Sequence, residues 1–334
     1  MDPAQAPAPD GRTGRGRVPD RQDAGHQDQR RILRGDEALT GSLTQEHRVR
    51  GILAMVVAVA VFSVMDSMLK LLAAHYAPLQ VAFVRGAAAL PFVLGTIVAR
   101  GRLARIRPVN VKLHVVRAVL SIVMLSAFVL AVRESSLAST YAIFMCAPLL
   151  VAGLSGPVLG EKVAGAQWGA IAVGLAGVLL MLKPGAGGWI TAGALWAVLA
   201  TAMYTISVVT LRLLARTDTN ESMVFWFTVT LAVGAGLLAI PDWHPLQAAH
   251  LPLMAGVGVC GALAQYLMTV AFRVAPAAVV TPFEYTALVW GAGLDIAIWS
   301  VWPSAVTLVG GAVVISAGLY VIARERRARQ PATA

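Results

Sequence analysis

The sequence predicts an all-α membrane protein of ten transmembrane helices, arranged as two inverted five-helix repeats. Apolar runs of about 20 residues alternate with short polar breaks, and such a run can cross a hydrocarbon core of about 30 Å. Only 13% of the 334 residues are charged, against about 25% in a soluble domain. Similar segments recur at a spacing of about 141 residues. Together, these observations indicate a polytopic membrane protein with an internal duplication.

The expected helices follow the apolar runs and end where turn-forming residues begin. Proline, glycine or asparagine occupies breaks such as 76–78, 107–110 and 183–188, as is typical of turns. The ten expected helices span residues 51–74, 78–99, 112–132, 137–158, 164–183, 189–213, 221–240, 251–272, 276–298 and 304–323.

Three pairs of segments carry the internal repeat. Residues 167–181 are similar to 308–322, residues 131–138 are similar to 271–278, and Phe62-Ser63 with Lys70 is similar to Tyr204-Thr205 with Arg212. We therefore expect a first repeat over residues 51–183 and a second over 189–324. Because five is an odd number, the second half would be inverted relative to the first. Secondary transporters are often built this way, with the site near the midplane between the halves.

The two ends of the chain differ from the apolar runs. Residues 1–47 are rich in Pro, Gly, Asp, Arg and Gln and almost lack apolar residues, so they cannot bury enough surface to offset the entropy cost of ordering. We expect a disordered cytoplasmic tail over 1–47 and a short cytoplasmic tail over 325–334. No apolar stretch of the signal-peptide type precedes Gly51.

The basic residues predict the orientation, because cytoplasmic loops carry an excess of Lys and Arg. With both termini in the cytoplasm, the outer segments hold only Arg133 and Lys183. The cytoplasmic segments would then hold Arg48, Arg50, Arg100, Arg102, Arg105, Arg107, Lys112, Lys162, Arg212, Arg216, Arg273, Arg324, Arg326, Arg327 and Arg329. This imbalance predicts a multi-pass protein of the cell inner membrane. It also explains the net charge of +10 without a nucleic-acid partner.

Four charged residues within the expected helices are candidates for function, since a charge at membrane depth costs roughly 3 kcal/mol unless it is paired or faces water. Asp66 and Lys70 lie four residues apart and can pair on one helix face. They are either a buried structural pair or a water-facing gate, with Asp66 a candidate for proton coupling. In a further alternative, Lys70 extends to the outer surface. Arg85 and Arg117 offer planar guanidinium groups that suit an anionic or zwitterionic substrate.

A second group of candidates contains Glu284, Tyr285, Tyr141 and Gln265. Glu284 and Tyr285 follow Pro282, and proline frees backbone carbonyls that can face a cavity. Glu284 could bind a cationic group or take up a proton. Tyr141 and Gln265 are candidates for lining the same cavity. The alternative for all four is hydrogen bonding or packing within the bundle.

Enzymatic activity is the first competing interpretation. Gly153-Leu-Ser155-Gly156 resembles the serine motif of rhomboid proteases, which need a histidine in a later membrane helix as general base. The later histidines, His244 and His250, fall in an expected outer loop. No metal-binding cluster or phosphate-binding loop is present in the sequence, so we expect no cofactor, no metal and no enzyme. A non-transporting membrane scaffold remains the other alternative.

Two motifs resemble the EamA family of the drug/metabolite transporter superfamily. The first is Leu159-Gly-Glu161 followed by Gln167-Trp168 and by Gly174 and Gly177; the second is the run from Pro282 to Trp290. The resemblance covers residues 51–324. In the second half, Val301-Trp302 stands where the family repeats its Gly-Glu pair, so only Glu161 could serve at that helix junction.

Met65-Asp66 with Lys70, the run 80–85 and Arg117 further resemble a subgroup that includes S-adenosylmethionine uptake and riboflavin transporters. The resemblance implies secondary transport of a small polar metabolite, such as an amino acid, a nucleoside or S-adenosylmethionine-like compound, or a vitamin-like compound. Proton coupling is a further hypothesis. So is a homodimer through the glycine-rich fifth and tenth helices, since glycines permit close helix approach.

Overall fold

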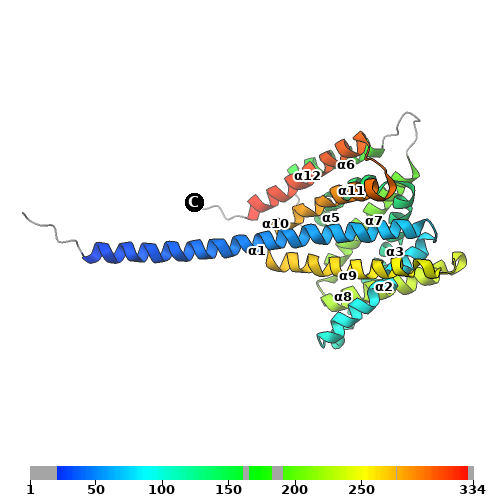
Figure 1. Cartoon of the computed structure of the whole chain (residues 1–334), viewed down its shortest axis with the longest axis horizontal. Coiled ribbons are helices and arrows are strands. Elements are labelled where there is room, and N and C mark those ends of the chain that lie inside the picture. The colour runs from blue at the N-terminus through cyan, green and yellow to red at the C-terminus, as the bar shows by residue number, and fades with distance from the viewer. Residues whose placement is uncertain (1–20, 161–164, 183–190, 276, 330–334) are drawn as a thin grey trace, which may run out of the picture. The chain divides into compact units, whose positions relative to one another are not determined.

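The computed structural model describes residues 21–160, 165–182, 191–275 and 277–329 (Figure 1). Every regular element in these ranges is a helix, and none of the described residues forms a strand. The predicted all-α class is therefore confirmed for this part of the chain. The chain divides into two units, residues 1–47 and 48–334.

The N-terminal unit differs from the expected disordered tail. Helix α1 (Arg21–Ala73) begins within it, so residues 21–47 are helical. This stretch contains no proline and is rich in Arg and Gln, which are good helix formers. In the expected C-terminal tail 325–334, residues 325–329 are the end of helix α12 (Ala305–Arg329). Residues 1–20 and 330–334 lie outside the described residues.

The larger unit holds the remaining long helices. Nine segments of the described residues are long and apolar enough to cross a membrane: Glu46–Ala73, Pro78–Ala99, Val111–Glu134, Leu137–Val158, Gly165–Leu182, Ala192–Leu214, Asn220–Asp242, Ala248–Val274 and Ala305–Arg324. They match nine of the ten predicted helices. The helices within them are α2 (Pro78–Ala99), α3 (Val111–Glu134), α4 (Leu137–Phe144), α5 (Ala147–Leu159), α6 (Gly165–Leu182), α7 (Ala192–Leu214), α8 (Asn220–Ala239), α9 (Leu251–Val274) and α12 (Ala305–Arg329).

Local sequence explains where several of these helices begin. The side chains of Asn110, Ser136, Thr191 and Thr219 each accept a hydrogen bond from a backbone N–H in the first turn of α3, α4, α7 and α8. Such caps satisfy a donor that has no partner inside the helix. Helix α2 instead starts with Pro78, whose missing N–H costs nothing in the first turn.

The tenth predicted helix, 276–298, is not continuous. Its described residues form α10 (Ala277–Val280), the 3₁₀ helix η4 (Thr281–Thr286) and α11 (Ala287–Trp299). The expectation of one regular helix is wrong because Pro282 lies inside the segment and removes a backbone donor.

The segment of α4 and α5 is interrupted in the same way. Helix α4 ends at Phe144 and α5 begins at Ala147, directly before Pro148. The starts of α5 and α11 are 140 residues apart, close to the repeat spacing in the sequence. The two interrupted segments pack against each other through α4 and α11.

Small residues let the long helices pack closely. Gly86 of α2 lies against the backbone of Ala232 in α8, and Gly177 of α6 lies against the Gly310 carbonyl in α12. Helix α3 packs along α7. The C-terminal part of α1 runs beside α9 (Figure 1), where Met55 belongs to the same buried cluster as Ala271. Each of these pairs joins one helix from each predicted half.

The bundle has two ends of different composition. The arginine face carries the 3₁₀ helix η1 (Leu103–Ile106) and the α7–α8 connection, with Arg102, Arg105, Arg107 and Arg216. The tryptophan face carries the α1–α2 turn, the connection through η2 (Ile240–Asp242) and η3 (Ala248–His250), and residues 300–304, with Trp243, Trp299 and Trp302.

Candidate functional site

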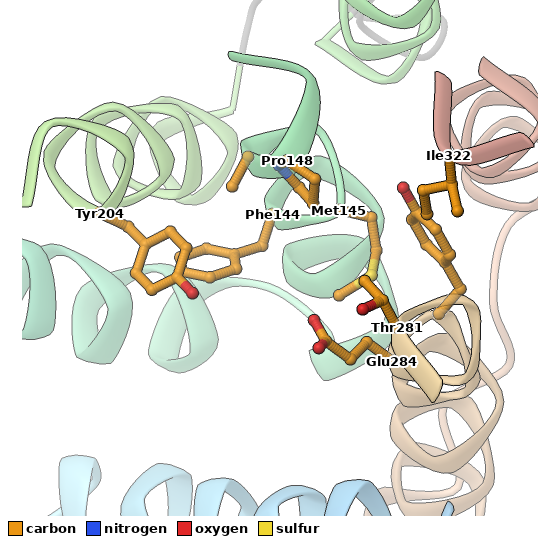
Figure 2. Close-up of a pocket in the computed structure, with 9 residues that line it drawn as sticks. Phe144, Met145, Pro148, Tyr204, Thr281, Glu284 and Ile322 are labelled. Atoms are coloured by element: carbon orange, nitrogen blue, oxygen red, sulfur yellow. The ribbon is translucent and has the colours of Figure 1, made fainter. Parts of the chain in front are cut away.

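A small pocket lies between the two interrupted segments. Its volume is about 90 Å³. Residues from the α4–α5 break, α7, η4 and α12 line it: Phe144, Met145, Ala147, Pro148, Tyr204, Thr281, Glu284, Tyr285 and Ile322 (Figure 2). The pocket therefore forms where both segments leave regular helical geometry.

Glu284 is the charged residue of this lining. It forms no ion pair or hydrogen bond with the described residues. Figure 2 shows its carboxylate pointing into the space that separates it from Phe144 and Tyr204. The rings of these two residues lie against each other, with centroids 4.9 Å apart and an interplanar angle of 47°. The pocket thus places one acid opposite a pair of aromatic rings.

Tyr285 completes the polar part of the lining. Its ring is buried, and its hydroxyl is buried without a hydrogen-bond partner among the described residues. Gly318 of α12 leaves the space for this hydroxyl, because a Cβ atom at Gly318 would overlap it. Of the predicted substrate-binding residues, Glu284 and Tyr285 line the pocket, but sequence reasoning did not select Phe144, Met145, Tyr204 or Thr281.

The Gly318→Ala variant tests this packing. The added methyl group would force the Tyr285 ring to move, and overpacking of this kind costs about 1–3 kcal/mol. We expect a lower midpoint of thermal unfolding in detergent. Gly169→Ala is the matched control, since its Cβ meets no atom of the described residues within 4 Å. Equal stability of the two variants would contradict this packing.

Three other predicted residues, of which Tyr141 is buried and Asp66 and Arg85 are partly buried, form a separate cluster. The Tyr141 hydroxyl donates a hydrogen bond of 2.7 Å to Asp66 Oδ2, and Arg85 attracts the Asp66 charge electrostatically. The Tyr141 ring lies against Gly291 of α11, where a Cβ atom would be 2.6 Å from it. The structure brings Asp66, Arg85 and Tyr141 together, but none of them lines the pocket.

The expected pairing of Lys70 with Asp66 is wrong. Lys70 Nζ instead lies 3.1 Å from Asp295 Oδ1 and 3.1 Å from the Ser135 carbonyl oxygen. Its ammonium group also lies 4.3 Å from the centroid of the Trp299 ring, and Asp295 Oδ2 accepts a hydrogen bond of 2.8 Å from Ala138 N–H. We call these five residues the Lys70 cluster. The partners of Lys70 thus come from α11 and from the connection between α3 and α4, and not from the acid on its own helix.

The Lys70 cluster is almost closed to solvent. The side chains of Lys70 and Asp295 are 12% and 1% exposed. Sequence reasoning missed the role of Asp295, although a lone acid inside the apolar run 287–299 was the available signal. A buried carboxylate of this kind requires a partner.

Arg117 and Gln265 lie away from the pocket. Arg117 donates a hydrogen bond of 2.9 Å to the Met223 carbonyl oxygen of α8, and its guanidinium carbon lies 4.5 Å from the centroid of the Phe227 ring. It therefore braces α3 against α8. Gln265 is exposed on α9, next to Tyr266, which is 64% exposed.

A second polar cluster, which sequence reasoning also missed, lies at the arginine face around Asp218. This carboxylate accepts hydrogen bonds from Val109 N–H, Asn110 N–H, His114 Nε2, Thr217 Oγ1 and Ser222 Oγ at 2.8 to 3.5 Å. We call these six residues the Asp218 cluster. Burial would raise the pKa of Asp218, but the hydrogen bonds outweigh this effect and hold the pKa at about 2. The signal was the polar run 217–222 between two apolar segments.

The remaining sequence motifs do not form a reactive site in the described residues. Ser155 donates a hydrogen bond of 2.8 Å to the Ala152 carbonyl oxygen of its own helix. Cys146 and Cys260 are free, and no three His, Cys, Asp or Glu side chains of the described ranges are grouped as metal ligands. Glu161 lies outside these ranges.

The fold defines a multi-pass helical membrane protein with a small pocket between interrupted segments. The sequence comparisons place it more narrowly. Residues 49–183 match the EamA-like transporter family. The chain therefore carries an EamA-family domain, and the resemblance predicted from the sequence is confirmed.

Curated relatives extend over most of the chain. A riboflavin transporter of Rhizobium johnstonii is 29% identical over 66% of this chain and 73% of its own length. A pseudopaline exporter of Pseudomonas aeruginosa is 28% identical over 80% of this chain and 94% of its own. An S-adenosylmethionine uptake transporter of Rickettsia prowazekii is 23% identical over 84% of this chain and 94% of its own length. All three relatives are named as transporters of small molecules; one is named an exporter and another an uptake transporter.

A solved crystal structure is similar in fold. It aligns with 86% of this chain and 99% of its own length, with a TM-score of 0.56 and 19% sequence identity. The helical architecture is therefore shared with a protein of very different sequence.

Proposed function

We propose that this protein is a secondary transporter that moves a small polar metabolite across the inner membrane by alternating access. The observation that carries the proposal is the pocket between the α4–α5 break and η4, with a Glu284 carboxylate that has no ion pair or hydrogen bond among the described residues. Interrupted segments in corresponding positions of two halves are the feature that most often marks a transporter binding site. The spacing of 140 residues between the starts of α5 and α11 supports that correspondence.

The proposed architecture has ten membrane segments in two inverted halves. The tenth segment is the interrupted run α10–η4–α11, and the halves are residues 51–183 and 189–324. The packing of α2 on α8 and of α6 on α12 supports this arrangement, because each pair joins corresponding helices of the two halves. The arginine face would be cytoplasmic, with both termini on that side, as the positive-inside rule favours.

Two polar clusters are suited to close the pathway at opposite ends. The Lys70 cluster joins α1 and α4 to α11 near the tryptophan face. The Asp218 cluster joins the start of α3 to the α7–α8 connection at the arginine face. Since each cluster links the two proposed halves, rocking of one half against the other would break one cluster at a time. Lys70 keeps its predicted role as a gate, with Asp295 in place of Asp66 as its partner.

Proton coupling and dimer formation are secondary hypotheses. Asp66 and Glu284 are the candidate proton carriers, because both are acids within membrane segments. A homodimer would use the outer faces of α6 and α12, where large apolar side chains such as Trp168 and Leu179 are exposed.

The thermal unfolding of the purified protein against a metabolite panel tests the proposal. The panel contains amino acids, S-adenosylmethionine, nucleosides, riboflavin and organic acids. A ligand at about 100 times its dissociation constant stabilises by about 2.7 kcal/mol, so a true substrate should raise the unfolding midpoint. The same compound should show saturable flux in vesicles.

Flux should survive in Ser155→Ala and fail in Glu284→Gln with normal membrane insertion. If neither stabilisation nor saturable flux occurs with any metabolite, the transporter proposal is wrong.

A further inference from the structure

We infer that the pocket at Glu284 binds the head group of a compact organic cation, such as a primary or methylated ammonium. The inference rests on the proposed function, because it assigns the substrate class of the same pocket. It departs from the anionic or zwitterionic group that the arginines in the sequence suggested.

The charges of the lining favour a cation. Among the part of the chain that the structure describes, the lining holds one acid, Glu284, and no Lys, Arg or His. Both arginines that were candidates for an anionic substrate lie outside this lining. Arg85 is near enough to Asp66 to attract its charge, and Arg117 contacts the Met223 carbonyl and the Phe227 ring. An anion entering this pocket would meet a carboxylate and find no base in the lining.

The apolar part of the lining also suits a cation. Aromatic faces attract cations through the ring quadrupole, and the effect grows when water is excluded. Phe144 and Tyr204 present adjoining rings on the side of the pocket opposite Glu284 (Figure 2). A cation between them would meet the carboxylate on one side and the rings on the other. The thioether of Met145 adds a polarisable contact on the wall of the pocket.

The carboxylate of the pocket gains a partner when a cation binds. Glu284 has no ion pair or hydrogen bond with the described residues, and a buried charge is costly unless it is paired. Binding of a cation would therefore give the Glu284 carboxylate the partner that the described residues do not supply.

The size of the pocket limits what it can hold. Its volume is about 90 Å³, whereas one water occupies about 30 Å³ in the liquid and a drug-sized ligand needs about 300 Å³ or more. The pocket therefore accommodates a head group, and the body of a larger substrate would extend from it along the pathway.

Three probes of similar size and different charge test the inference: choline, its uncharged isostere 3,3-dimethyl-1-butanol (dimethylbutanol), and the anion 3,3-dimethylbutyrate (dimethylbutyrate), whose charge lies at the end opposite the tert-butyl group. Their dissociation constants are measured with the purified full chain by isothermal titration and by the shift in thermal unfolding. We expect choline to bind at least about tenfold more tightly than dimethylbutanol, which corresponds to about 1.4 kcal/mol, and dimethylbutyrate to bind more weakly than both. If dimethylbutanol or dimethylbutyrate binds as tightly as choline, the inference is overturned.

Variants locate the effect. Glu284→Gln should remove the preference for choline over dimethylbutanol. Glu134→Gln, the same chemical change at an exposed position outside the pocket, should keep the preference. Tyr204→Leu retains an apolar wall and should weaken choline more than dimethylbutanol. If Glu284→Gln folds and keeps the full preference, the cation binds elsewhere and the inference fails. If Glu284→Gln does not fold, Tyr204→Leu is the deciding variant: a reduced preference for choline supports the inference, and an unchanged preference overturns it.

Vesicle flux separates this inference from the transporter proposal. Saturable flux of a metabolite together with equal binding of the three probes would leave transport standing and overturn the cation pocket. Selective choline binding that depends on Glu284, without saturable flux of any cation or metabolite, would support the pocket and contradict transport.

Discussion

Replacing Lys70 with methionine should lower the free energy of unfolding by about 3–5 kcal/mol, the usual cost of removing one partner from a buried ion pair. The variant would leave Asp295 as a buried carboxylate whose described partner is one backbone N–H, that of Ala138. It would also remove the hydrogen bond to the Ser135 carbonyl and the contact with the Trp299 ring. Reversible unfolding in mixed micelles gives the free energy directly.

Two control variants distinguish the effect of breaking the Lys70–Asp295 ion pair from the general effect of removing a lysine side chain. Lys112→Met makes the same change at an exposed position with no ion pair in the described residues and should cost less than about 0.5 kcal/mol. The double variant Lys70→Met with Asp295→Asn removes both charges and should recover much of the loss, because a neutral amide is less costly to bury than an unpaired carboxylate. Additive losses in the double variant would show that the two side chains do not act as a pair.

The second large effect is expected from Asp218→Ala, which should destabilise the protein by roughly 3 kcal/mol. A buried polar group left without its partner costs about 1–3 kcal/mol, and the change strands the side chains of His114 and Ser222, which are both buried. Asp242→Ala is the matched control, since the Asp242 side chain is 76% exposed. If both variants are equally stable by unfolding in mixed micelles, the Asp218 cluster does not hold the arginine face.

The stability that Asp218 contributes should also depend on pH in one direction. Its pKa lies at about 2 in the folded protein, below the ordinary value of 3.8. A lowered folded-state pKa means that the carboxylate stabilises the fold fully above about pH 4 and loses this effect as the pH falls towards about 2. The stability difference between the wild type and Asp218→Asn should therefore shrink between about pH 4 and pH 2. A constant difference over this range would contradict the lowered pKa.

Local patterns in the sequence predicted elements well and partners poorly. Apolar run lengths and turn residues predicted nine of the spans to within a few residues, because a membrane span depends on local composition and length. Pro282 drew attention to Glu284 and Tyr285, which both line the pocket. The same proline interrupts the helix that the apolar pattern predicted as continuous.

Lys70 illustrates the limit of local reasoning. The acid at the next turn of its helix, Asp66, was the natural partner by spacing, but Asp295, 225 residues away, forms the ion pair. Asp66 is engaged instead by Tyr141. Both choices depend on how α1, α4 and α11 pack, and helix packing is set by contacts between segments that are distant in the chain.

The sequence by itself determined that the chain is helical and apolar enough to span a membrane, that it carries an EamA-family domain, and that acids and arginines lie within its spans. Tertiary structure alone decided which of those charges meet. It paired Lys70 with Asp295, turned Arg117 to the α8 backbone, and left Glu284 without a described partner beside Phe144 and Tyr204. The physical reason is that an unpaired buried charge is costly, so each charge is stabilised by whichever partner lies near it in the folded structure. Which helices lie near one another cannot be read from spacing along the chain.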